Sequence, residues 1–235
     1  MFVSLSIVRY PRYFIPFALL SMAIFRLPLL FTSGLTFWKL MGCGKNGTFD
    51  IKPDWMQWGL LAVWEQEEDF DRFQQKSFIR KWWKTFAHEQ WTILCIPYEA
   101  HGKWDGKQPF IPNHAYKNYQ GPVAVLTRAS IRVSKLKSFW SNVPGVAQNL
   151  AEAEGFITSV GIGEVPFVRQ ATFSVWENLD AVKQFAYRKQ KHASIIKKTR
   201  SEEWYSEELF ARFIPIRSQG TLNGTQPFIL QHVTA

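Results

Sequence analysis

Apolar and polar positions along the chain predict the same strand and helix twice. Residues 123–127, Val-Ala-Val-Leu-Thr, form a short apolar run typical of a buried strand. Ser134 then provides a helix N-cap, and apolar residues follow at the i, i+3, i+4 and i+7 spacing of an amphipathic helix, namely Leu136, Phe139, Trp140 and Val143. Near the amino terminus, residues 3–8 predict a strand and residues 17–24 a helix in the same order.

The remaining elements are also predicted in pairs. They are a strand at 36–41 and 157–160, a strand at 58–64 and 170–176, a helix around 70–73 and 179–186, and a strand at 92–98 and 211–216. Each half of the chain therefore has the order β-α-β-β-α-β, which is that of the ferredoxin-like unit.

Local sequence matches support an internal repeat. Leu-Ala-Val-Trp-Glu at 61–65 returns as Phe-Ser-Val-Trp-Glu at 173–177, and both glycines and the Gln-Pro-Phe of residues 102–110 return in residues 220–228. The other matched pairs are Gly34 with Gly155, Phe37 with Phe156, Gly42 and Gly44 with Gly161 and Gly163, Phe73 with Phe185, and Trp91 with Trp204.

A ferredoxin-like unit covers one face of its sheet with helices, so two tandem units can bury their bare faces against each other as a closed barrel. We therefore predict an α+β fold in which two tandem ferredoxin-like repeats form an α/β barrel. The first repeat spans 1–110, a linker spans 111–120, the second repeat spans 121–228 and a tail spans 229–235.

The apolar stretch from Tyr13 to Phe31 has the length of a membrane span or a signal peptide. Arg26 and two prolines lie inside it, which counts against a span, and no clear small-x-small cleavage site follows it. Because the repeat places the first helix here, we interpret the stretch as a helix of the first repeat.

Composition narrows the classes of function. A chain that is 46% hydrophobic, with 20 Phe and 11 Trp, is not disordered. The 28 Lys and Arg against 19 Asp and Glu give a net charge of +9, which attracts phosphates, anionic lipids or an acidic cofactor. Tandem RNA-recognition domains would need a basic-aromatic strand signature that is missing, so we expect no nucleic-acid partner. Cys43 and Cys95 are expected as core thiols.

Catalytic features are best sought where the second repeat departs from the first. In the first repeat an apolar stripe at helical spacing consists of Ile79, Trp82, Trp83 and Phe86. Matching Trp91 with Trp204 carries this stripe to His192, Ile195, Ile196 and Thr199. A core isoleucine thus becomes a histidine, whose ring nitrogens need partners because burying them unsatisfied costs about 1–3 kcal/mol.

A hydrogen-bonded core histidine is the simple interpretation of His192, and a metal ligand is the functional one. Zinc needs three or four protein ligands, whereas haem supplies four nitrogens itself and asks the protein for one. We therefore predict that His192 is the axial ligand of a haem iron and that Ile195, Ile196 and Thr199 line the cofactor.

A second departure lies on the strand at 169–176. Alternation places Gln170, Thr172 and Ser174 on one face, where the first repeat has Trp58, Leu60 and Ala62. We expect these polar groups inside the barrel as hydrogen-bond donors to a bound oxygen species, with Arg169 near the entrance of the strand. The predicted catalytic set is Arg169, Gln170, Thr172 and Ser174.

These residues also carry a family resemblance. The most specific motif is Trp-Tyr-Ser-Glu-Glu-Leu-Phe-Ala-Arg-Phe at 204–213, and further motifs stand at 37–42, 61–65, 101–106, 121–129, 161–164 and 169–174. From residue 37 to residue 228 the chain resembles the spheroidene monooxygenase family, carotenoid oxygenases of purple bacteria and their relatives. No family motif assigns His192, which comes from the repeat alone.

The resemblance implies a haem-dependent monooxygenase that uses dioxygen and an electron donor to oxidise an acyclic carotenoid or a similar apolar substrate. It also implies the barrel superfamily that contains chlorite dismutases, dye-decolourising peroxidases and aldoxime dehydratases. The alternatives are another haem enzyme on this barrel, of dehydratase or peroxidase type, and a cofactor-free barrel oxygenase. We expect a cytoplasmic protein that associates peripherally with the surface of anionic membranes, where polyenes dissolve.

Overall fold

The computed structural model describes residues 1–45, 52–116, 119–188, 199 and 201–227. The first half contains β1 (Phe2–Arg9), α1 (Ile15–Ile24), α2 (Arg26–Leu30), β2 (Leu35–Gly44), β3 (Pro53–Trp64), α3 (Glu67–Lys76), α4 (Phe78–Phe86) and β4 (Glu89–Gly102). The second half contains β5 (Val123–Ile131), α5 (Leu136–Ala151), β6 (Phe156–Val165), β7 (Arg169–Trp176), α6 (Leu179–Arg188) and β8 (Tyr205–Gly220). Both halves have the predicted order β-α-β-β-α-β.

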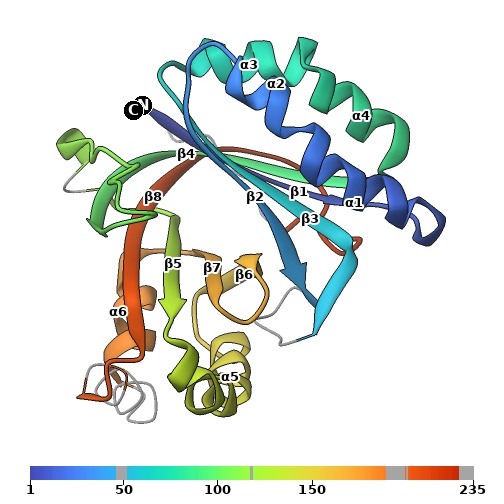
Figure 1. Ribbon diagram of the computed structural model, residues 1–235. Helices are drawn as coiled ribbons and strands as arrows, with labels where there is room; N and C mark the ends of the chain where they lie inside the picture. The colour runs from blue at the N-terminus through green and yellow to red at the C-terminus, as the bar shows by residue number, and fades with distance from the viewer. Residues whose placement is uncertain (46–51, 117–118, 189–198, 200, 228–235) are drawn as a thin grey trace.

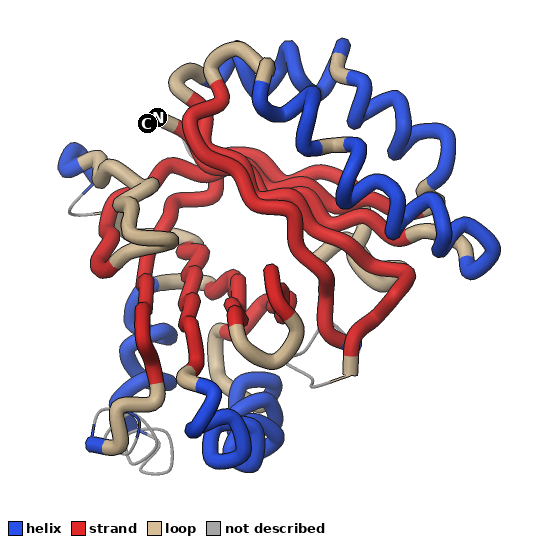
Figure 2. The backbone as a smooth tube through the Cα atoms, in the orientation of Figure 1, coloured by secondary structure: helices blue, strands red, loops and turns tan. Residues whose placement is uncertain are grey.

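All the named strands close into one barrel in the order β1-β3-β2-β6-β7-β5-β8-β4 (Figure 2). The halves meet along a long antiparallel seam between β4 and β8 and a short one between β2 and β6. Helices α1 to α4 cover the outer face of the first repeat, and α5 and α6 lie outside the second (Figure 1). The predicted α+β barrel of two ferredoxin-like repeats is therefore confirmed.

Alternate positions of every strand fill the barrel with apolar side chains from both repeats. Leu61 and Ile93 come from the first repeat and Phe173 and Phe213 from the second, and the last two rings stack with centroids 6.2 Å apart. Cys43 and Cys95 are buried in this core, as expected, and burial raises the pKa of both thiols, which keeps them protonated.

The two Val-Trp-Glu motifs occupy equivalent positions. Trp64 pairs with Phe2 across β1 and β3, and Trp176 pairs with Val123 across β5 and β7. Each indole packs on the phenylalanine nine residues later, with ring centroids 5.1 Å apart for Phe73 and 5.3 Å apart for Phe185. The repeat is thus visible in packing as well as in topology.

The strand register corrects four of the matched pairs, namely those of Trp91, Phe37, Gly42 and Gly44. Trp91 pairs with Ile7 as Leu209 pairs with Arg128, so the equivalent of Trp91 is Leu209 and the match with Trp204 is wrong. Likewise Gly42 corresponds to Gly163 and Leu35 to Phe156, because those residues occupy matching places on β3 and β7. An insertion before β8 explains the shift at Trp91, whereas β2 and β6 align without one and were mismatched by two residues.

The apolar stretch near the amino terminus is confirmed as the first helical segment of the repeat. Ala18, Ser21, Phe25 and Leu29 are its buried residues and pack toward the sheet. Among the described residues, the stretch 12–30 is the one helical segment long and apolar enough to cross a membrane by length and composition. Only 22% of it is buried within the protein.

Gly155 turns the chain from α5 into β6 with a φ of 72°, and a Cβ there would lie 2.6 Å from the Cβ of Ala181 in α6. We expect Gly155→Ala to lower the free energy of unfolding by about 3 kcal/mol, combining left-handed strain with overpacking. Gly106 has a similar φ of 73° but open space around it, so Gly106→Ala costs about 1 kcal/mol. Urea unfolding followed by tryptophan fluorescence checks both, and equal losses would contradict the predicted close packing of α6 on Gly155.

Candidate functional site

The polar positions of β7 lie on the outer, helix-covered face of the sheet. Ala171, Phe173 and Val175 point into the barrel core, so the alternate positions Gln170, Thr172 and Ser174 point outward. The predicted shared face is therefore present, but its expected place inside the barrel is wrong. The interior is filled by the apolar residues of both repeats.

Helices cover this outer face less completely in the second repeat than in the first. Ser6 and Leu60 are paired across β1 and β3 and are both buried under the helices. Their equivalents, Thr127 and Thr172, are paired across β5 and β7, yet Thr127 is exposed and Thr172 is partly exposed. The middle of the second sheet is thus accessible where the first is closed.

The apolar contacts explain the difference. In the first repeat one continuous cluster joins the helices to the sheet, whereas the described residues of the second repeat form two separate clusters. One packs α6 on the sheet through Val125, Val182 and Phe185, and the other packs α5 through Ile131 and Phe139. Between these clusters lie the polar positions of β5 and β7. The arrangement is a polar strip flanked on both sides by apolar walls.

Of the four residues predicted to bind the cofactor, only Thr199 lies within the described part of the chain. His192, Ile195 and Ile196 lie outside the described residues. Thr199 is described: its carbonyl accepts a 3.1 Å hydrogen bond from the backbone of Trp204, and its side chain bonds the Tyr205 hydroxyl. Burial raises the pKa of Tyr205 to about 12, so this phenol stays protonated.

The alignment that led to His192 also changes. It used the match of Trp91 with Trp204, which the strand register replaces with Leu209. The equivalence of His192 with Ile79 therefore has no support from β8, and what remains is its position in the sequence between α6 and β8. His192 stays a prediction.

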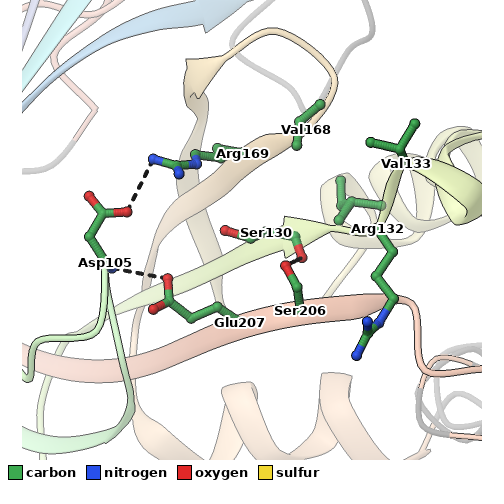
Figure 3. A pocket seen from close by; sticks show the side chains of 9 residues that line it. Asp105, Ser130, Arg132, Val133, Val168, Arg169, Ser206 and Glu207 are labelled. Atoms are coloured by element: carbon green, nitrogen blue, oxygen red, sulfur yellow. Dashed lines mark hydrogen bonds and ion pairs between the residues drawn. The ribbon is translucent and has the colours of Figure 1, made fainter.

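Arg169 separates from the other predicted catalytic residues. Its guanidinium donates to Asp105 over 3.1 Å, and it lines an open cavity of about 420 Å³ at one end of the barrel (Figure 3). The other lining residues are Asp105, Ser130, Ile131, Arg132, Val133, Val168, Ser206 and Glu207. The structure thus brings together Gln170, Thr172 and Ser174, and places Arg169 in a different environment.

Sequence reasoning missed a charged cluster beside this cavity. Arg128 occupies the inward position that Ile7 holds in the first repeat, and its side chain is 1% exposed. It forms ion pairs with Glu207, with Glu164 at 3.5 Å and with Asp105 at 3.6 Å. A comparison of inward strand positions between the repeats would have identified this change from isoleucine to arginine.

The cations and hydrogen bonds of the cluster keep two of its carboxylates ionised. Burial opposes ionisation of Asp105, but its hydrogen bond with Lys39 and the charges of Lys39, Arg169 and Arg128 outweigh burial, so its pKa lies below the ordinary value. For Glu207, burial is outweighed by hydrogen bonds from the backbone of Gly106 and Asp105 and by Arg128, which also lower the pKa. Both carboxylates are charged at neutral pH.

The geometry shows what the cluster holds in place. The turn at Trp104 to Gly106 belongs to the first repeat, and the indole of Trp104 donates to Glu164 of the second repeat over 2.8 Å. The opposite end of the barrel has the matching arrangement, in which Arg9 binds Asp54 at 3.0 Å and Asn223 at 2.8 Å. Each repeat's hairpin is therefore fastened to the other repeat by polar contacts.

Comparison with known proteins identifies the family. No family model matches the chain. Spheroidene monooxygenase of Rhodobacter capsulatus is 33% identical over 99% of this chain and 98% of its own length, and that of Rubrivivax gelatinosus is 36% identical over 84% and 75%. The chain belongs to the spheroidene monooxygenase family.

The resemblance found in the sequence motifs is therefore confirmed for this member of the spheroidene monooxygenase family. The relative from Cereibacter sphaeroides is 38% identical over 81% of this chain, which spans 59% of that protein's length. Two crystal structures of aldoxime dehydratase share the fold, with TM-scores of 0.58 and 0.59 over 91% of this chain at 11% and 10% identity. The matched regions cover 79% and 80% of the two dehydratase chains.

We expect Arg128→Ala to lower the free energy of unfolding by about 2–3 kcal/mol. Removing one partner of a fully buried ion pair costs roughly 3–5 kcal/mol of stability, and the loss here is smaller because the carboxylates partly reach water. The lowered pKa values stabilise the folded state above about pH 4, and this stabilisation is lost as the pH falls further. Arg128→Ala should therefore also flatten the acid loss of stability.

Urea unfolding between pH 3 and pH 7 measures both effects of the Arg128→Ala substitution. Arg132→Ala is the control, because Arg132 is an exposed arginine on the same cavity and its loss should stay within about 0.5 kcal/mol. A loss at Arg128 no larger than that of the control would show that the cluster does not fasten the two repeats.

Proposed function

We propose that the protein is a monooxygenase that inserts one oxygen atom into an acyclic carotenoid or a similar long apolar molecule. Its named relatives support the reaction class and the substrate class. The observation that carries the proposed location of the reaction is the accessible polar strip on the outer face of the second sheet, at Thr127 and Thr172. Dioxygen and an electron donor are the remaining reactants that this chemistry requires.

The donor set around the strip is compatible with haem. Porphyrin is flat and apolar with charged edges, and it binds between apolar walls with one protein ligand to its iron. The helices that flank the strip carry apolar residues on both sides, Val182 and Phe185 on α6 and Phe139 on α5. Among the described residues no group of three or more His, Cys, Asp and Glu is placed to hold a metal ion.

In this proposal His192 holds the haem and Ile195, Ile196 and Thr199 line it. When bound, haem supplies the activation of dioxygen that an unassisted side chain does not provide. The protein contributes a floor of short polar side chains in which Thr172 and Gln170 orient polar groups by hydrogen bonds. Ser174 is engaged already, since its hydroxyl accepts a 2.9 Å bond from Trp176.

Arg169 has a separate role in the proposal. Its guanidinium faces the barrel-end cavity and pairs with Asp105, so it helps hold the first repeat's hairpin. Of the predicted catalytic set, Thr172 therefore remains as the residue that faces the reaction, with Gln170 beside it on the same face. Gln170 donates a 3.1 Å hydrogen bond to the carbonyl of Val165, Ser174 supports the adjoining tryptophan, and Arg169 supports the fold.

We expect His192→Ala to fold but to lose the visible haem absorption of the purified protein, because haem loses its only predicted protein ligand. Loss of turnover should follow, measured with reductant, oxygen and an acyclic carotenoid as products heavier by one oxygen. His88→Ala is the matched control, since His88 is exposed and lies between α4 and β4 of the first repeat. It should keep both the spectrum and the turnover.

The outcomes separate the alternatives. An unchanged haem spectrum in His192→Ala would assign the ligand to another residue. A colourless wild-type protein that still oxidises the carotenoid would make it a cofactor-free oxygenase. A haem protein that turns over an aldoxime or a peroxide and forms no oxygenated carotenoid would belong to the dehydratase or peroxidase type, and the proposed function would be wrong.

A further inference from the structure

The helical segment formed by α1 and α2 presents an apolar surface to solvent. Its exposed residues are apolar except for Arg26, and they are Pro16, Phe17, Leu19, Leu20, Ala23, Leu27 and Leu30, with Tyr13 and Phe31 flanking them. Tyr13 is 75% exposed, Leu20 50%, Leu27 65% and Phe31 80%. Soluble surfaces rarely keep so many large apolar side chains contiguous, which marks an interaction site.

This surface does not arise from a loosely attached helix. Phe25 and Leu29 on the opposite side are buried against the first repeat, and Phe17 stacks on Phe86 of α4 with ring centroids 4.9 Å apart. Phe25 also contacts Trp82 of α4 edge to face at 5.8 Å. The inner side of the segment thus fixes it in place. The apolar residues on its outer side are not needed for that packing.

The charges on the segment and on the neighbouring helix α4 are of one sign. Arg12 and Arg26 lie on the segment itself, and the neighbouring helix α4 carries Arg80, Lys81 and Lys84. Neither α1, α2 nor α4 contains an acidic residue. On α3, Asp69 pairs with Arg72, and Glu67 and Asp71 pair with Arg217, while Glu68 is exposed.

We propose that α1 and α2 form a docking surface for an anionic phospholipid bilayer. The apolar side chains would enter the boundary between headgroups and acyl chains, and the surrounding cations would contact lipid phosphates. A second copy of the chain fits less well. Twofold pairing brings the same patch of each copy together, so the arginines and lysines at its rim would face each other.

The position of the segment suits this partner. Figure 1 shows α1 and α2 on the outer side of the first repeat, on the opposite side of the barrel from α5 and α6. A bilayer can therefore contact the segment along its length while the second repeat remains in water. The proposal rests on exposure and charge, and it holds whether or not the protein oxidises carotenoids.

Vesicle sedimentation tests the proposal without any carotenoid present. The purified full chain is mixed with vesicles of phosphatidylcholine alone or of equal parts phosphatidylcholine and phosphatidylglycerol. We expect binding to the anionic vesicles that weakens with salt, and much weaker binding to the neutral ones. The double substitution Leu20→Glu with Leu27→Glu should weaken binding to the anionic vesicles by about tenfold or more. Two apolar side chains that enter the bilayer would become negative charges, which the anionic lipids repel.

Ile111→Glu is the matched control, because Ile111 is 66% exposed and lies outside the segment, and it should bind as the wild type does. Phe31→Asp provides a second variant at the most exposed position and should also weaken binding. Light scattering coupled to gel filtration follows the oligomeric state of each protein. The proposal would be overturned if the variants Leu20→Glu with Leu27→Glu and Phe31→Asp bound the anionic vesicles as well as the wild type does. It would also be overturned if the wild type did not bind vesicles and instead formed a dimer that these variants dissociate.

Discussion

The apolar inner face of each ferredoxin-like sheet must be removed from water, and the barrel is the arrangement in which one repeat does this for the other. Leu61 and Ile93 of the first repeat meet Phe173 and Phe213 of the second in one shared core. Because the core needs both sheets, neither repeat can change its inner face freely. The outer faces are left to diverge, and it is there that the repeats differ most.

The divergence has two parts with different consequences. The first repeat keeps a continuous apolar layer between helices and sheet, which stabilises the fold. The second repeat replaces Leu60 with Thr172 and leaves the pair Thr127 and Thr172 accessible, which gives up apolar burial. The second repeat gives up apolar burial at a position where the first repeat keeps it. Such a local loss of stability is typical of a functional site.

The sequence predicted the fold well because its signals were local and repeated. Trp64 and Trp176, with Phe73 and Phe185, share one packing arrangement, so the motif was a reliable guide to structure. The site was predicted less well for a geometric reason. Strand alternation shows that Gln170 and Thr172 share a face, but only the closed barrel shows that this face is the outer one.

The same reason explains the other departures. Arg128 forms ion pairs with residues from three distant parts of the chain, so no local pattern indicates its cluster. The match of Trp91 with Trp204 compared similar residues where strand register assigns Leu209, because the segment between helix and strand differs in length between the repeats. The shared face of Gln170, Thr172 and Ser174 depends on strand alternation alone and is present, whereas the match of Trp91 with Trp204 crosses an insertion and is wrong.

Amide hydrogen exchange with and without added haem most directly tests the claim that the second repeat's outer face is the site. Haem bound there should slow exchange in peptides from α5, α6, β5 and β7, while the equivalent peptides from α1, α4, β1 and β3 exchange unchanged. Slowed exchange in the first repeat, around the barrel-end cavity of Arg169, or in no part of the chain would contradict the account.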